Sequence, residues 1–294
     1  MSLAQVLDRP PIKLRLGELP VLPAVVLRLM SLSPQSEELF EEVLAVAQED
    51  PGFALRVMHI ANSAMSSPAS RIETLERAVA RLGAAHVADL VTTVAMTRVF
   101  VPRTPAEKDL WRHAVEVATA CRAIIRRHPV NGVSAEQGYL AGLLHDIGHF
   151  IMIAQAPWSV QAVEALGSTT PAELIEAERE VCGTDHTELG AQVCAYWSVP
   201  ERIVFVVKDH HRSIADVPSP LLAALKQADW LSVWRHSHVG GNNPVEALQL
   251  AIPDGEMAAV PDAPRLTAAE LVRLLPEVSE ASTRTVAALG LATH

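Results

Sequence analysis

An adjacent histidine and aspartate, His145-Asp146, stand inside a strongly apolar stretch and form the most chemically suggestive pair in the chain. Residues 139–144 and 147–153 on either side are mostly apolar, so we expect the pair to lie on a buried helix. A buried carboxylate without a partner is costly, and Asp146 must therefore be paired or bound to a metal ion. Neutral imidazole and carboxylate are ligands suited to Fe, Mn, Ni or Zn. Neighbouring helical residues project about 100° apart, so one ion could lie in the cleft that this pair flanks.

Further histidines and one aspartate could complete such a site. The candidates are His113, His186, His210, His211 and Asp229. Each of these residues could instead have a structural role. A lone histidine on an apolar helix is more often a core residue with its hydrogen bonds satisfied. His210-His211 could cap a helix C-terminus, and Asp229 could pair with Lys226. His149 follows His145 by four residues, so both can share one helix face. The sequence leaves three roles open for His149: an extra metal ligand, a substrate contact, or a residue that supports the ligands without binding the metal.

The elements that must carry these residues are helices. Leu, Ala and Val recur at three- and four-residue spacing almost throughout, and alternating strand patterns with tight hairpin turns are absent from the sequence. Capping boxes mark helix starts at residues 104–107, 170–173 and 267–270, and residues 134–137 give a similar signal. We therefore predict an all-α fold with more than ten helices.

Two breaks in the helical pattern suggest how the chain is divided. Residues 101–105 contain two prolines, and residues 238–244 contain two glycines and a proline. These breaks predict an N-terminal helical subdomain over residues 1–103, a helical domain with the candidate ligands over residues 104–240, and a C-terminal helical extension over residues 241–294.

Composition excludes several classes of partner. The 294 residues include 24 Lys and Arg against 34 Asp and Glu, a formal net charge of −10. We therefore expect no nucleic-acid partner and no binding to an anionic membrane. The most apolar segments carry charged residues or histidines and do not predict membrane spans. Three cysteines without a CxxC pair argue against disulfides or a thiolate zinc site, so we expect a cytoplasmic protein.

The order of the candidate ligands resembles a known signature. His113, His145-Asp146 and Asp229 are similar to the H…HD…D pattern of HD-domain phosphohydrolases, and Gly148 after Ile147 gives the HDIG form. Over roughly residues 15–235 the chain resembles the HDOD family, the HD-related output domain. The matching segments are residues 19–23, 50–56, 60–63, 75–83 and 140–148. This resemblance implies a bacterial signalling protein with a multi-helical HD-domain-like bundle and an N-terminal helical subdomain.

A longer pattern, H…HD…H…HH…D, is typical of the related HD-GYP phosphodiesterases, which hold two metal ions. By this resemblance the first ion would be bound by His113, His145, Asp146 and Asp229, and the second by Asp146, His186, His210 and His211. Asp146 would bridge the two ions. The chain departs from the pattern at His149, where HD-GYP proteins usually have Lys, and after His211, where the GYP loop is missing. The resemblance therefore does not extend to cleavage of cyclic di-GMP.

Two functions are consistent with these residues. The first is a metal-dependent phosphohydrolase that acts on a nucleotide or cyclic nucleotide, with two divalent ions about 3.5–4 Å apart. Arg112 and Arg212, each next to a ligand position, would then contact the phosphate of this small-molecule partner. The second is a non-catalytic signalling output module with a structural metal site, which binds a partner protein. We favour the first and leave the second open.

Overall fold

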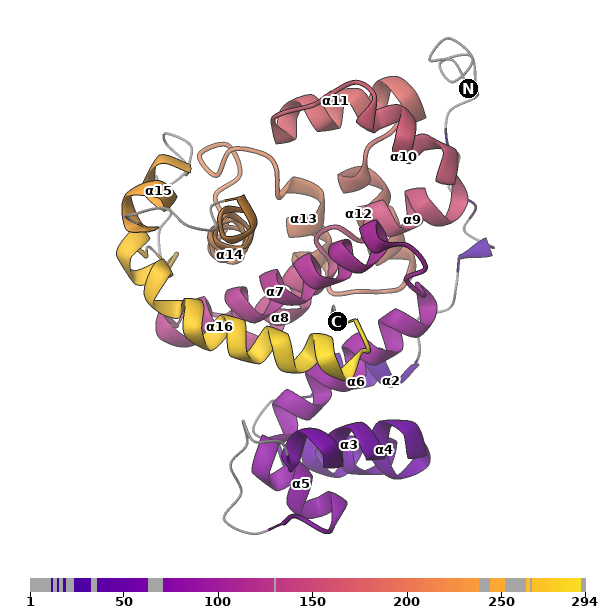
Figure 1. The fold of residues 1–294 in the computed structure, drawn as a ribbon, viewed down its shortest axis with the longest axis vertical. Coiled ribbons are helices and arrows are strands. Elements are labelled where there is room, and N and C mark those ends of the chain that lie inside the picture. Colours follow the sequence, from indigo (N-terminus) through magenta and orange to yellow (C-terminus); the bar gives the residue numbers. More distant parts are fainter. Residues whose placement is uncertain are drawn as a thin grey trace. The chain divides into compact units, whose positions relative to one another are not determined.

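Helices account for all the regular structure in the described part of the chain. The computed structural model describes residues 12, 15, 18–19, 24–32, 36–62, 71–129, 131–237, 244–251, 263–264 and 266–291. Within these ranges it contains helices α2 to α16 and no β-strand (Figure 1). The predicted all-α fold with more than ten helices is thus confirmed. Residues 20–23, 63 and 238–243, where some of the sequence motifs fall, lie outside the described residues.

The chain forms two compact units. Unit 1 comprises Met1–Pro20 and Asp109–Val278, and unit 2 comprises Val21–Lys108 and Ser279–His294. Packing alone does not show which parts fold independently, so the three-part domain division remains a prediction. No single helix of the described residues has the length and apolar composition of a membrane span. Helices α5 (Leu75–Leu82) and α6 (Ala84–Val99) meet those criteria only when they are taken as one segment, and the chain bends by 102° between them.

Unit 2 is a small bundle with its own apolar core. Its helices are α2 (Ala24–Ser31), α3 (Glu37–Glu49), α4 (Pro51–Ala61), α5 (Leu75–Leu82) and α6 (Ala84–Val99). Val43, Val57 and Leu90 are among its buried residues. Asp50 caps α4 by accepting a hydrogen bond from the Phe53 backbone N–H at 3.0 Å. The Asn62 side chain donates to the carbonyl oxygen of Ile72 at 2.9 Å and accepts from the Ile72 N–H at 2.8 Å. These two hydrogen bonds link the C-terminal end of α4 to the residues just before α5.

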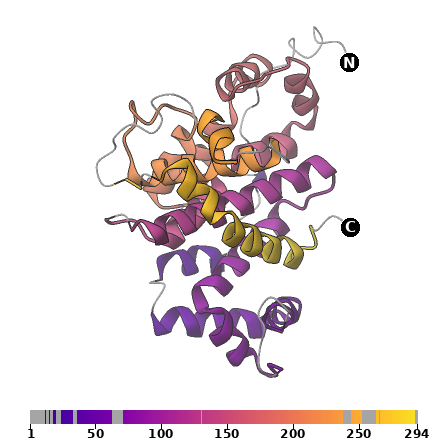
Figure 2. The same ribbon diagram turned by 60° about the vertical axis from the view of Figure 1, so that its left-hand side comes forward.

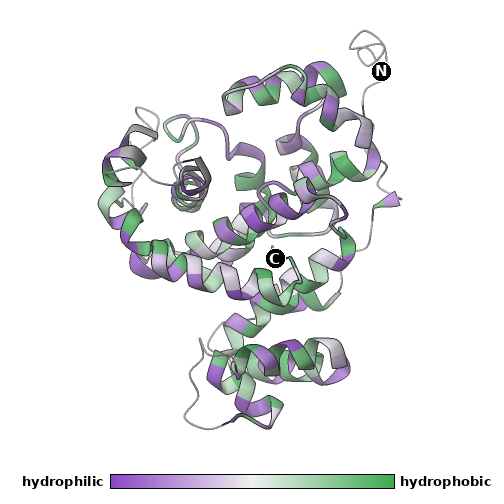
Figure 3. Ribbon diagram, in the orientation of Figure 1, coloured by the Kyte–Doolittle hydropathy of each residue, from purple (hydrophilic) through white to green (hydrophobic). Residues whose placement is uncertain are grey.

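Unit 1 contains the predicted ligands. Its helices are α7 (Pro105–Arg127, which starts in unit 2), α8 (Ala135–Leu144), α9 (Ile147–Gln155), α10 (Pro157–Glu164), α11 (Pro171–Cys182), α12 (His186–Tyr196), α13 (Glu201–Asp209), α14 (Pro220–Ser237), α15 (Pro244–Ala251) and the first half of α16 (Ala268–Ala288). Helix α12 packs on both α9 and α13, and α14 packs on α8 and α13. Figure 2 shows the ribbon from a second direction. Hydrophobic and hydrophilic residues alternate along many of the helices, as amphipathic packing requires (Figure 3).

The helix starts predicted from capping boxes are confirmed. Thr170 and Glu173 exchange side-chain to backbone hydrogen bonds at the start of α11, and Ser134 and Gln137 do so at the start of α8. At the start of α16, Thr267 accepts from the Glu270 N–H while Glu270 accepts from the Thr267 N–H. These bonds satisfy early N–H groups that have no partner within the helix.

Two glycines on one face of α8 allow its backbone to approach α7. A Cβ atom added to Gly142 would lie 2.5 Å from the backbone N and Cα of Ala118. One turn earlier, a Cβ atom on Gly138 would instead meet the Cδ1 of Ile125 at 2.4 Å, the far end of a flexible side chain. The separation between α7 and α8 is therefore limited most strictly at Gly142.

We predict that Gly142→Ala lowers the free energy of unfolding by about 1–3 kcal/mol, because a methyl group there displaces a helix backbone. Gly138→Ala is the matched variant on the same helix. Its cost should be smaller, since Ile125 can change rotamer and alanine favours the helix by about 1 kcal/mol over glycine. Urea denaturation followed by circular dichroism measures both values, and an equal loss in the two variants would contradict this account of the packing.

Candidate metal centre

All seven predicted ligands lie together in unit 1. They come from α7 (His113), the junction of α8 and α9 (His145, Asp146), the start of α12 (His186), the end of α13 (His210, His211) and α14 (Asp229). Asp146 stands between the others. Its Oδ2 is 3.3 Å from His145 Nε2 and 3.7 Å from His113 Nε2.

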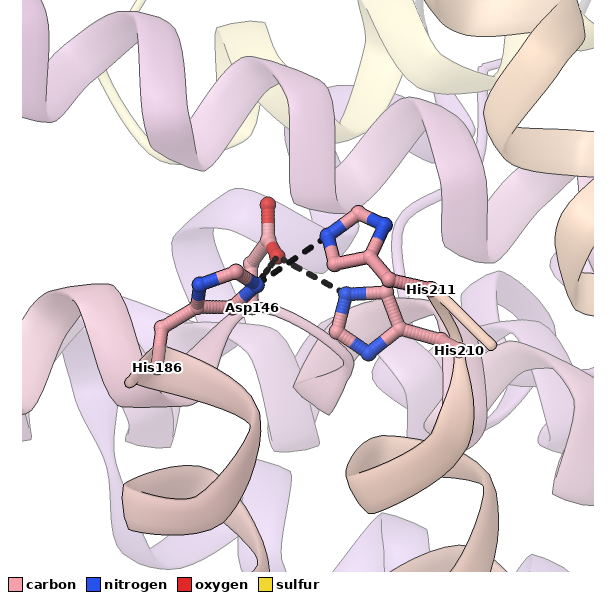
Figure 4. A group of neighbouring side chains, drawn as sticks. All are labelled: Asp146, His186, His210 and His211. Carbon is pink, nitrogen blue, oxygen red and sulfur yellow. Dashed lines mark hydrogen bonds and ion pairs between the residues drawn. The ribbon is translucent and has the colours of Figure 1, made fainter. Parts of the chain in front are cut away.

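The other Asp146 oxygen faces a second set of histidines. Its Oδ1 is 3.7 Å from His186 Nε2 and 3.5 Å from His210 Nε2, and His211 Nε2 is 3.1 Å from His186 Nε2 (Figure 4). On the first side, His113 Nε2 lies 3.2 Å from His145 Nε2 and 3.3 Å from Asp229 Oδ1. One carboxylate thus separates two groups of nitrogen and oxygen atoms.

The His145-Asp146 pair lies at a break between two helices. Helix α8 ends at Leu144 and α9 begins at Ile147, so the expectation of a continuous helix across this pair is wrong. His145 Nδ1 donates to the carbonyl oxygen of Gly142 at 2.8 Å. This carbonyl belongs to the last turn of α8, where backbone carbonyl groups have no partner within the helix. Both residues are nevertheless buried, as expected, with 1% and 9% of their surfaces exposed.

Gly148 of the HDIG motif positions this pair against His186. A Cβ atom on Gly148 would lie 1.8 Å from the backbone oxygen of His186, so only glycine lets α9 come this close to the first turn of α12. The contact fixes His186 relative to His145-Asp146. This glycine therefore serves the geometry of the cluster.

Hydrogen bonds assign the protons of three imidazoles. The Nδ1 atoms of His145 and His210 each lie 2.8 Å from a backbone carbonyl oxygen, that of Gly142 and of Val207, and His186 Nδ1 lies 2.7 Å from Glu178 Oε2. A carbonyl or carboxylate oxygen only accepts, so each Nδ1 carries the proton. The Nε2 atoms of His186 and His210 then direct lone pairs towards Asp146, and the Nε2 of His145 is the atom that takes up or loses a second proton.

His113 is held in the same tautomer by a longer chain of hydrogen bonds. The Ser232 hydroxyl donates to Glu116 Oε2 at 2.8 Å, and Glu116 also pairs with Arg235. Because the hydroxyl proton is used there, Ser232 Oγ accepts from His113 Nδ1, which is 3.1 Å away. The Nε2 lone pair of His113 therefore also faces the cluster.

This arrangement of donors fits divalent transition metals. Lone pairs of imidazoles and a carboxylate repel one another when they converge, unless a cation lies between them. His210 Nε2 is buried and has no hydrogen-bond partner. Two ligands bound at 2.0–2.2 Å to one ion lie about 3.0–3.5 Å apart, close to the spacings of 3.1–3.7 Å seen here. Within the described residues, two groups that share Asp146 have ligand atoms near enough to hold an ion.

Burial and charge shift the pKa values inside the cluster. Burial alone would lower the pKa of His145, but the Asp146 and Asp229 carboxylates outweigh it and raise this pKa to about 9. Burial would raise the pKa of Asp229, yet its contact with the His113 ring and the nearby charge of His145 bring it down to about 2. Burial together with the neighbouring His210 lowers the pKa of His211 to about 3. The metal-free cluster thus combines an imidazolium with two carboxylates and neutral imidazoles.

Sequence analysis missed the support that four buried residues give to the predicted ligands. Glu178 and Ser232 contact His186 and His113, and Glu116 supports Ser232. Lys226 Nζ donates to the backbone oxygens of His210 and Arg212 at 3.2 and 2.6 Å, and so anchors the segment with the His-His pair. Ser232 lies 119 residues after His113, and no local pattern links two such positions.

The two arginines predicted to contact phosphate pair with nearby carboxylates. Arg112 pairs with Asp109 and Arg212 with Asp209, in each case three residues earlier on the chain. Their role towards a phosphate stays a prediction. His149 is closer to the cluster, with its Nε2 4.0 Å from Asp146 Oδ1.

Comparison with known proteins shows what this chain is similar to. The profile of the HDOD domain matches residues 19–213. A crystal structure of an HDOD domain protein of unknown function from Geobacter sulfurreducens is 25% identical, with a TM-score of 0.72 over 92% of this chain and 93% of the other. A Shewanella amazonensis SB2B protein, provisionally named a phosphohydrolase, is 22% identical, with a TM-score of 0.61 over 89% and 98% of the two chains.

A relative from Treponema pallidum is longer than this chain. This protein, named only as uncharacterized, is 23% identical over 206 residues, which are 67% of this chain. The present chain covers 38% of the length of that protein.

We predict that divalent metal binding releases protons at pH 7. The proton of His145, with a pKa of about 9, must leave when a cation binds to its Nε2. Calorimetric titration of the metal-free protein with Zn²⁺ in buffers of different ionisation enthalpy should show the release of roughly one proton. The release should fall, and the affinity rise, between pH 7 and pH 9. A proton count of zero at pH 7 would contradict this pKa value.

Proposed function

The chain belongs to the HDOD domain family, and from this premise we propose that it is a metal-dependent phosphohydrolase acting on a nucleotide or cyclic nucleotide. One observation carries the proposal: the two oxygens of the buried Asp146 face separate sets of imidazoles whose Nε2 atoms point inward. A single bridging carboxylate between two sets of ligands is the arrangement of a two-metal site, which suits displacement at phosphorus.

Each proposed ion has four protein ligands. His113, His145, Asp146 and Asp229 would hold the first, and Asp146, His186, His210 and His211 the second. Four ligands complete the tetrahedral shell that Zn²⁺ prefers, but they leave positions open on a six-coordinate ion such as Mn²⁺ or Fe²⁺. Since catalysis requires an open position, we propose Mn or Fe as the active metal ahead of Zn.

The chemistry divides between the ions and the chain. When bound, such ions lower the pKa of water and offset negative charge on a phosphoryl group. The chain supplies imidazoles fixed in one tautomer and a buried setting in which electrostatic interactions are strong. Arg112 and Arg212 are proposed to contact the phosphate, which requires each guanidinium to turn from its present aspartate.

The substrate class is supported by likeness alone. The H…HD…D order of ligands and the fold shared with the Shewanella protein favour a phosphate ester, and the missing GYP loop argues against cyclic di-GMP. We therefore propose nucleotide monoesters and other nucleotide diesters as the compounds to test.

We predict that the full chain loaded with Mn²⁺ or Fe²⁺ hydrolyses at least one nucleotide phosphodiester or monoester, and that His145→Ala reduces turnover to the background rate. Asp146→Asn is a second variant of nearly unchanged shape, for the case that His145→Ala does not fold. His59→Ala changes an exposed histidine of unit 2 and should retain full activity.

Phosphate release and nucleotide chromatography measure the turnover, and circular dichroism checks folding. Equal turnover in the wild type and in folded His145→Ala would contradict the proposal. A wild type that binds metal and hydrolyses none of these compounds would also contradict it, and would favour a signalling output module with a structural metal site.

A further inference from the structure

Glu178 on α11 is buried beside two histidines of the cluster, with 1% of its surface exposed. Its Oε2 accepts two hydrogen bonds from His186, one from Nδ1 at 2.7 Å and one from the backbone N–H at 2.9 Å. Its Oε1 lies 3.4 Å from His149 Nδ1. One carboxylate therefore contacts the Nδ1 edge of both rings.

The two rings lie side by side in the same orientation. The His149 and His186 ring centroids are 4.0 Å apart, and the ring planes differ by 15°. Their opposite edges both face Asp146, with His186 Nε2 3.7 Å and His149 Nε2 4.0 Å from Oδ1. His149 is thus presented to the cluster in the same way as the proposed ligand His186, but at a partly exposed position.

The ligand atoms of these three residues are also close enough to hold an ion of their own. The geometry argues against that role. An imidazole lone pair lies in the plane of its ring, so two nearly parallel rings 4.0 Å apart cannot both direct lone pairs at one ion. Glu178 Oε2 is moreover already the acceptor of two N–H groups. The carboxylate acts here as a hydrogen-bond acceptor.

We propose that Glu178, when ionised, is a positioning residue that keeps the protons of His186 and His149 on Nδ1, so that His149 presents an unprotonated Nε2 at the edge of the cluster. The part that concerns metal rests on the proposed function, because it assumes that the cluster binds cations. An outer carboxylate that orients a ligand imidazole commonly changes metal affinity by 10–100-fold. A partly exposed, unprotonated Nε2 beside the cluster is also a suitable proton acceptor.

Glu178→Gln separates the two contacts. The position of Oε2 faces two N–H donors from His186, so the amide oxygen of Gln belongs there. The amide NH₂ then faces His149 Nδ1, which must become an acceptor and move its proton to Nε2. Glu178→Gln should therefore switch the tautomer of His149 alone, whereas Glu178→Ala releases both rings.

The tautomers are measured by ¹⁵N NMR of the imidazoles in the metal-free full chain. Spectra are recorded at pH 9, above the pKa of about 8 of Glu178. We expect the proton on Nδ1 of both rings in the wild type, on Nε2 of His149 only in Glu178→Gln, and unrestricted in both rings of Glu178→Ala. Glu180→Gln, at an exposed position of the same helix, is the control and should match the wild type. Unchanged tautomers in both Glu178 variants would overturn the proposal.

Titration with Co²⁺, followed by its visible absorption, tests the effect on metal binding. Glu178→Ala should bind Co²⁺ 10–100-fold more weakly than the wild type, and Glu178→Gln should lose less. In a His149→Ala background, Glu178→Gln should cause no further loss of Co²⁺ affinity, because the effect of this substitution acts through His149. Equal Co²⁺ affinity in the wild type and Glu178→Ala would overturn the proposal. A wild type that binds no Co²⁺ would instead refute the proposed function, while the tautomers would still test the role of Glu178.

Discussion

The burial of Asp146 among imidazole nitrogens is the constraint on which the rest of unit 1 depends. Its two oxygens lie 3.3–3.7 Å from four Nε2 atoms. Hydrogen bonds on the far side of each ring keep a proton on Nδ1, so the Nε2 atoms converge on Asp146 with lone pairs that are free for a cation once His145 has lost its second proton. Such a centre is electrostatically unfavourable by itself, and divalent cations are the simplest means of stabilising it.

Packing of the helix backbones brings these groups together. Gly142 lets α8 approach α7, and Gly148 lets α9 approach the first turn of α12. The break between α8 and α9 places both His145 and Asp146 at helix ends, where their side chains are not restricted to one helical face. Lys226 holds the backbone of the His210 segment from α14. Close contacts between helices therefore determine the geometry of the cluster more than any single helix does.

Much of the fold, and the residues that make up the cluster, could be predicted from the sequence, because both leave local signals. Capping boxes at Thr170 and Thr267 marked helix starts, and the H…HD…H…HH…D order picked out residues that the structure brings together. Supporting residues left no such signal. Glu178 looks like any acidic residue of an amphipathic helix, and the link from His113 through Ser232 to Glu116 exists only after folding. The break at His145-Asp146 was missed because apolar residues continue on both sides of it.

The central claim, that the inward lone pairs bind cations, is tested most directly by anomalous diffraction from crystals of the full chain grown with Mn²⁺ or Fe²⁺. We expect two anomalous peaks on either side of Asp146, one about 2.0–2.3 Å from the Nε2 atoms of His113 and His145 and one equally close to those of His186 and His210. Crystals that diffract well, contain the metal in the solution and show no anomalous peak beside Asp146 would contradict it.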